Sequence, residues 1–188
     1  MKIAVLGSHP ITKMLAPFGD PGWAIFACSP HNFHTPDWQK MFVGGIPPKG
    51  FPDGRLPRVD AWFEVHTPAV HETRSPEYLD YVRELSGRIP VYMRDRSGHP
   101  KALAYPVKET ERRFGPFFFT SSIAYLMAFA IMQKPEMIGI WGVMQATATE
   151  FAYQRPGIQY FIQQAWNEGI KVVAPEQSRL FDVTQVVW

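Results

Sequence analysis

Residues 119–131 read Phe-Thr-Ser-Ser-Ile-Ala-Tyr-Leu-Met-Ala-Phe-Ala-Ile, residues 138–143 read Ile-Gly-Ile-Trp-Gly-Val, and residues 150–155 read Glu-Phe-Ala-Tyr-Gln-Arg. The first run is apolar almost all round after a serine pair that can cap a helix, so it predicts a buried helix. The run 137–143 is short, apolar and interrupted by glycine, which predicts a buried strand. Together with the polar loops on either side, these elements form half of an α/β nucleotide-binding layout.

The length and composition are those of one ordered globular domain. The 188 residues are 46% hydrophobic and contain no long charge run, so we expect a single domain over residues 1–188. The formal net charge of +2 does not indicate a nucleic-acid or membrane surface. Cys28 is the only cysteine, which excludes an intrachain disulfide and a zinc site built on thiolates.

The sequence predicts neither a signal peptide nor a membrane-spanning segment. Lys2 is followed by a short apolar run that ends at Gly7, and no other run approaches the roughly 20 apolar residues that a spanning helix needs. We therefore expect a cytoplasmic protein.

Short apolar runs that end in turn residues predict a mainly parallel sheet of about six strands. They lie near residues 2–6, 22–28, 59–65, 89–93, 137–143 and 170–174. Between them, capping residues and prolines at helix starts predict helices near residues 11–18, 75–85, 108–114, 123–132 and 156–169. The expected architecture is a Rossmann-like three-layer α/β fold.

The turn after the first strand is a candidate ligand site. Gly7, Ser8 and His9 would lie at the carboxyl end of that strand, where backbone N–H groups and the next helix N-terminus favour an anion. Gly7 alone does not make the Gly-x-Gly-x-x-Gly fingerprint, so the pattern indicates a phosphate or carboxylate cradle and not a dinucleotide site. A tight strand-to-helix turn without a ligand explains the same residues.

A long segment rich in proline, glycine and aromatic residues follows the second strand. Ser29, directly after that strand, is a further candidate for the same ligand, and residues 30–58 form a long loop insertion. Loops of this length inside a compact domain are usually functional, as a lid or an oligomer contact. His31 and His34 within it are more typical of surface residues than of metal ligands.

Glu64 and His66 form a Glu-x-His pair at the end of the third predicted strand. Residues two apart on a strand face the same side, so the two side chains can converge. A carboxylate that orients an imidazole is an acid/base unit or a substrate clamp, and the strand end is where open α/β sheets bind ligands. A buried hydrogen bond that fixes the strand end is the structural alternative.

The central stretch supplies the remaining candidates. Ser121 and Ser122 lie at the helix N-terminus that would hold phosphates. Gly142 allows a ligand or a neighbouring backbone to approach closely. Gln154 and Arg155, on the returning loop, would clamp the anionic or amide-bearing part of a substrate.

The order of these motifs resembles that of small Rossmann-like proteins, many of them encoded in bacteriophage genomes. Residues 121–143 are more distantly similar to the core of the 6-hydroxymethylpterin diphosphokinase-like and motility-associated glycosyltransferase-like group. Members of that group pair a serine-capped helix with a strand that ends in Gly-Val-Asp. The resemblance implies a nucleotide-dependent transferase.

Two departures from the group bear on that activity. Met144 occupies the position of the aspartate after Gly-Val, and the first strand ends in Gly-Ser-His-Pro where the group carries a glycine-proline-serine turn. Glu150 is the candidate that would replace the missing carboxylate, which makes Glu64, His66 and Glu150 the expected catalytic residues.

The sequence is compatible with three functions. The first is a nucleotide-binding transferase that acts on a nucleotide-activated sugar or another nucleotide substrate. The second is a binding protein that sequesters a nucleotide or small molecule without turnover. The third is a structural or assembly protein, in which the aromatic loop makes subunit contacts in a homo-oligomer. The expected ligand is a nucleotide, and the need for a divalent metal is left open.

Overall fold

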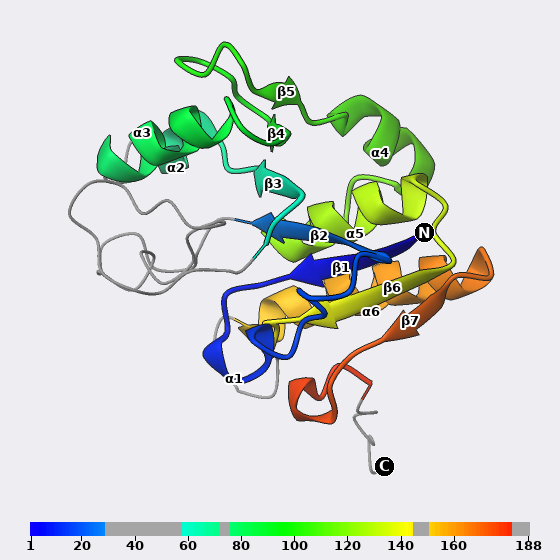
Figure 1. Cartoon of the computed structure of the whole chain (residues 1–188). Helices are drawn as coiled ribbons and strands as arrows, with labels where there is room; N and C mark the ends of the chain where they lie inside the picture. Colours follow the sequence, from blue (N-terminus) through cyan, green and yellow to red (C-terminus); the bar gives the residue numbers. More distant parts are fainter. Residues whose placement is uncertain (29–57, 72–75, 145–150, 182–188) are drawn as a thin grey trace.

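The computed structural model describes residues 1–28, 58–71, 76–144 and 151–181 (Figure 1). Ser29, Glu150 and residues 30–57 of the predicted insertion lie outside the described residues. The elements between these gaps are built around one β-sheet.

Within the described ranges the sheet has seven strands, in the order β5-β4-β3-β2-β1-β6-β7, and every neighbouring pair is parallel. The strands are β1 (Lys2–Leu6), β2 (Trp23–Cys28), β3 (Ala61–Glu64), β4 (Val91–Met93), β5 (Leu103–Ala104), β6 (Met137–Trp141) and β7 (Lys171–Val173). The predicted sheet is confirmed, but the prediction of about six strands missed β5. That strand has only two residues, both exposed, at the edge of the sheet, and so short a run does not indicate a strand in the sequence.

Among the described residues, the first and the last α-helix differ in extent from the prediction, and two short helices were not predicted. The helices are α1 (Pro10–Lys13), α2 (Pro68–His71), α3 (Pro76–Leu85), α4 (Val107–Phe114), α5 (Ser122–Met132), α6 (Phe151–Asn167) and the 3₁₀ helix η2 (Glu176–Ser178). The first helix, predicted over residues 11–18, has only four residues. The helix predicted to start at Pro156 begins at Phe151, so Gln154 and Arg155 are helical and do not lie in a returning loop. A proline inside a helix removes one backbone donor but does not by itself prevent helical residues before it.

The helices cover both faces of the sheet, as a three-layer fold requires. Alternate residues of β1 serve opposite faces: Ile3 and Val5 pack with α5 and α6, whereas Ala4 and Leu6 pack in the cluster that contains α3. In Figure 1, α5 and α6 lie behind β1, β2 and β6. All residues from 123 to 131 are buried, which explains why α5 is apolar on every side.

The chain segments at the carboxyl ends of β1 and β6 lie close together and are joined by backbone hydrogen bonds. Because β1 has β2 on one side and β6 on the other, the strand order reverses here, the usual place for a ligand in an open α/β sheet. Gly7 donates its N–H to the Trp141 carbonyl and His9 donates to the Gly142 carbonyl, both at 2.8 Å. A Cβ on Gly142, whose φ is +63°, would lie 2.2 Å from the Gly7 oxygen. Of the two explanations for Gly142, the structure shows the approach of a neighbouring backbone.

We expect Gly142→Ala to lower the free energy of unfolding by about 3 kcal/mol or more, because left-handed strain of about 1–2 kcal/mol adds to overpacking of about 1–3 kcal/mol. Gly169→Ala is the matched control, since Gly169 has φ +74° but no heavy atom within 4 Å of an added Cβ. The control should lose only the strain, about 1–2 kcal/mol. Urea unfolding measures both variants, and equal losses would contradict the close contact.

Candidate functional site

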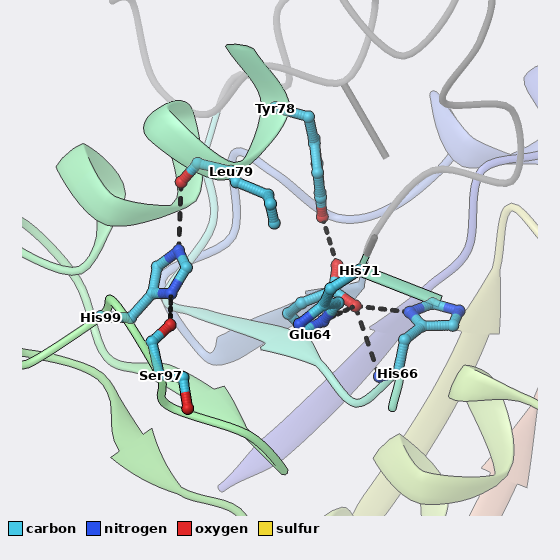
Figure 2. Close-up of polar contacts among 7 residues, drawn as sticks. All are labelled: Glu64, His66, His71, Tyr78, Leu79, Ser97 and His99. Atoms are coloured by element: carbon cyan, nitrogen blue, oxygen red, sulfur yellow. Dashed lines mark hydrogen bonds and ion pairs between the residues drawn. The ribbon is translucent and has the colours of Figure 1, made fainter. Parts of the chain in front are cut away.

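The carboxylate of Glu64, at the end of β3, is fully buried and surrounded by donors. Tyr78 of α3 donates its hydroxyl to Oε2 at 2.6 Å. Nδ1 of His66 lies 2.5 Å from Oε1, and the backbone N–H of His66 donates to the same oxygen at 3.3 Å. Figure 2 shows these side chains converging on one carboxylate. A charge at this depth is costly without partners, so these donors are what stabilises an ionised Glu64.

A second imidazole faces the same carboxylate oxygen. His71, the last residue of α2, places Nε2 3.4 Å from Oε1 of Glu64. That nitrogen is buried and makes no hydrogen bond with any described residue. The contact is therefore electrostatic, and it becomes an ion pair when His71 is protonated.

The pair formed by Glu64 and His66 can carry acid/base chemistry. The side chain of His66 is 27% exposed, whereas that of Glu64 is inaccessible, so the imidazole stands between the carboxylate and the surface. In Figure 2 the ring nitrogen that does not contact Glu64 points away from it. A carboxylate behind an imidazole fixes the orientation of the ring and stabilises its protonated form.

A second polar group lies where α5 begins, at the same edge of the sheet. Ser121 caps α5 by accepting the Ala124 N–H at 3.3 Å, and Ser122 is the first helical residue. Arg94, directly after β4, donates from Nη1 to the hydroxyl of Tyr125 at 2.8 Å. Burial raises the pKa of Tyr125, and the charge of Arg94 opposes that rise. A guanidinium near a helix N-terminus suits a phosphate group.

In the turn formed by Gly7, Ser8 and His9, two backbone N–H groups already donate hydrogen bonds within the fold. The N–H group of Gly7 bonds to Trp141 at the end of β6, and that of His9 bonds to Gly142, the next residue, as described above. The following helix has four residues, so its dipole is small. Ser8 and His9 are half-buried, and burial lowers the pKa of His9 below the ordinary histidine value.

Gln154 and Arg155 contact two different segments. The hydroxyl of Thr120 donates to the Gln154 carbonyl at 3.2 Å, which joins α6 to the segment before α5. Arg155 donates from Nη2 to the Arg179 carbonyl at 3.4 Å, next to η2. The guanidinium of Arg155 therefore contributes to holding the segment that follows the last strand.

Two predicted site residues, Ser29 and Glu150, fall outside the described part of the chain. Across residues 1–28, 58–71, 76–144 and 151–181, no three His, Cys, Asp or Glu side chains are grouped so that they could hold a metal ion. In those same ranges, no helix combines the length and the apolar character needed to cross a bilayer.

Four residues that lie around Glu64 or at the start of α5 were not predicted as site residues from the sequence: Tyr78, His71, Arg94 and Tyr125. Tyr78 belongs to the apolar stripe of α3, which predicts its burial, but the sequence does not indicate which residue accepts the hydrogen bond from its hydroxyl. Arg94, after β4, had no sequence pattern that separated it from a solvated arginine.

The fold is similar to those of a pyrophosphokinase and a sialyltransferase of known structure. No protein-family model matches this sequence, and no curated protein matches it. Among solved structures, the chain is similar to thiamine pyrophosphokinase from Bacillus subtilis, at 11% identity and a TM-score of 0.50. The alignment covers 93% of this chain, which spans 60% of the length of the pyrophosphokinase chain.

The chain is also similar to the sialyltransferase CstII from Campylobacter jejuni, solved with the substrate analogue CMP-3FNeuAc, at 13% identity and a TM-score of 0.52. This alignment covers 92% of this chain and 79% of the sialyltransferase. A second CstII structure, with CMP and a trisaccharide acceptor, gives 12% identity and the same TM-score. At such identities the likeness shows the fold alone, and it confirms the predicted distant resemblance to diphosphokinases and glycosyltransferases at that level.

Loss of the Tyr78 hydroxyl should cost more stability than loss of a comparable hydroxyl elsewhere. We expect Tyr78→Phe to lower the free energy of unfolding by about 2 kcal/mol, because a bond to a charged acceptor is worth about 1.5–3 kcal/mol. Tyr105→Phe is the control: Tyr105 is also buried, but it donates to the neutral Tyr125 carbonyl at 2.8 Å. Its loss should cost about 1 kcal/mol. If chemical denaturation ranks the two variants in the opposite order, Glu64 is not the charged acceptor described here.

Proposed function

We propose that the protein binds a nucleotide-type ligand at the carboxyl edge of the sheet and transfers a group from it to an acceptor. The buried Glu64 carboxylate behind His66 is the observation that carries the proposal. It supplies an acid/base pair at the sheet edge where open α/β folds bind ligands. The shared fold with transferases supports the same reaction class.

In this proposal His66 exchanges a proton with the acceptor. An acceptor hydroxyl gives its proton to the imidazole as its oxygen attacks the transferred group, and the leaving nucleotide departs with the bonding electron pair. Glu64 stabilises the imidazolium that forms, Tyr78 holds the carboxylate through its hydrogen bond, and His71 adds an ion pair when it is protonated. Proton transfer to a positioned side chain such as His66 contributes roughly 10²–10⁴-fold to a transfer rate.

The phosphate side of the ligand is assigned to the N-terminus of α5 and to Arg94. Ser121 and Ser122 bring backbone N–H groups and the positive end of the helix dipole, and the exposed Arg94 adds a planar guanidinium. The tight packing of Gly7 against Gly142 argues against a phosphate between those two loops. The contact between Arg155 and Arg179 favours a structural role for that arginine.

A binding protein without turnover is the second candidate. Met144 favours it, because this half-buried side chain occupies the position at which the resembled diphosphokinase-like group keeps an aspartate. Such a protein would capture the nucleotide through the same phosphate contacts and leave it chemically unchanged.

Calorimetry with a nucleotide and nucleotide-sugar panel tests the phosphate assignment. We expect Arg94→Ala to raise the Kd about tenfold or more, since a charge-assisted bond is worth about 1.5–3 kcal/mol. Arg88→Ala is the control, because Arg88 is an exposed arginine whose Nη2 lies 3.9 Å from Glu84. The same Kd change in both variants would refute a specific role for Arg94.

Product analysis by mass spectrometry separates the two candidate functions. His66→Gln should keep the Kd within about threefold while turnover falls by roughly 10²-fold or more. Complete recovery of every ligand by the wild-type protein supports capture without turnover. A panel in which no nucleotide binds contradicts both candidates.

A further inference from the structure

His99 is a buried histidine outside the site described above. Its side chain lies between α3 and the turn that follows β4, and the residue is only 3% exposed. Nδ1 lies 2.9 Å from the Ser97 carbonyl oxygen, and Nε2 lies 3.1 Å from the Leu79 carbonyl oxygen. Figure 2 shows the ring between these two partners.

Both partners of His99 can only accept hydrogen bonds. A neutral imidazole has one N–H donor and one acceptor nitrogen, whereas the imidazolium has two donors. Two bonds to carbonyl oxygens therefore require hydrogen on both nitrogens. With one hydrogen removed, a nitrogen lone pair would face a carbonyl lone pair in a buried position.

We propose that His99 is a proton-dependent clamp, which as the imidazolium ties α3 to the turn after β4 and as the neutral ring releases α3. The Leu79 carbonyl lies inside α3 and also has a helical N–H partner available, whereas Ser97 lies in a turn. Loss of the Leu79 contact is thus the less costly choice. The neutral ring keeps hydrogen on Nδ1.

Charged groups from both packed elements surround the clamp. On the turn, Asp95 accepts from the Ser97 N–H at 3.0 Å and from its hydroxyl at 2.7 Å. The hydrogen bond from the Ser97 N–H is the main cause that lowers the pKa of Asp95. The charges of His71 and His99 lower this pKa as well. Arg96 donates to the Ala102 carbonyl at 3.4 Å, and Lys101 belongs to the same turn.

Arg83 of α3 provides a second tether that does not depend on pH. It pairs with Asp80 and donates from Nε to the Gly98 carbonyl at 2.9 Å. Because arginine stays protonated, this bond persists when His99 loses its proton. Release of the clamp is therefore local, and it frees the turn of α3 around Leu79.

Release of the Leu79 carbonyl affects the contacts of Glu64, because a single peptide bond joins Leu79 to Tyr78. Tyr78 precedes Leu79 in α3 and donates to Glu64. Movement of that helical turn changes a donor of the buried carboxylate. This coupling would hold whether or not the protein transfers a group.

The test measures His99 and α3 together between about pH 5 and pH 8.5, a range that includes the ordinary titration of histidine. Long-range ¹H–¹⁵N NMR of the imidazole rings distinguishes the imidazolium from the two neutral tautomers. Hydrogen exchange, corrected for its intrinsic pH dependence, reports the protection of the α3 amides. The proteins compared are the wild type, His99→Gln and Arg83→Gln.

We expect the imidazolium pattern at low pH and the Nδ1–H tautomer at high pH. The hydrogen-exchange protection of the α3 amides should fall about tenfold from low to high pH in the wild type and in Arg83→Gln, because one charge-assisted bond is lost. His99→Gln should show no such step. A single neutral tautomer at every pH, an Nε2–H tautomer at high pH, or pH-independent protection in the wild type would overturn the proposal. The wild-type spectra decide it even if His99→Gln does not fold.

Discussion

The carboxyl edge of the sheet depends on the contacts that the buried carboxylate of Glu64 makes. This carboxylate has no access to solvent, so its oxygens must be satisfied from within the protein. The partners come from separate elements: His66 follows β3, His71 ends α2, and Tyr78 lies on α3. One charge thereby fixes the end of a strand and the positions of two helices around it.

Much of the fold could be predicted from the sequence, because the sheet is buried on both faces. Strands such as Lys2–Leu6 and Met137–Trp141 are short apolar runs with glycine after them, and the helix at Ser122–Met132 has its own serine cap. The start of α6 could not be predicted in this way. Pro156 suits a first helical turn, and no local signal showed that the helix extends back to Phe151.

The candidate site could be predicted only where residues are neighbours in sequence. Glu64 and His66 are two apart on a strand, so the period of the backbone brings them together. Tyr78 and Arg94 reach their partners across the fold, over separations that carry no periodic pattern. For Gly142 the sequence allowed a ligand or a backbone contact, and only the position of Gly7 in space distinguishes them.

We propose that a nucleotide binds at the carboxyl edge of the sheet, beside Glu64 and the side chains that contact it. Titration of ¹⁵N-labelled protein with CMP and the other nucleoside monophosphates, followed by amide NMR, tests it most directly. We expect chemical-shift changes concentrated at His66, Arg94 and Ser122. Changes confined to the opposite edge, around Glu136 and Lys171 at the starts of β6 and β7, would contradict it.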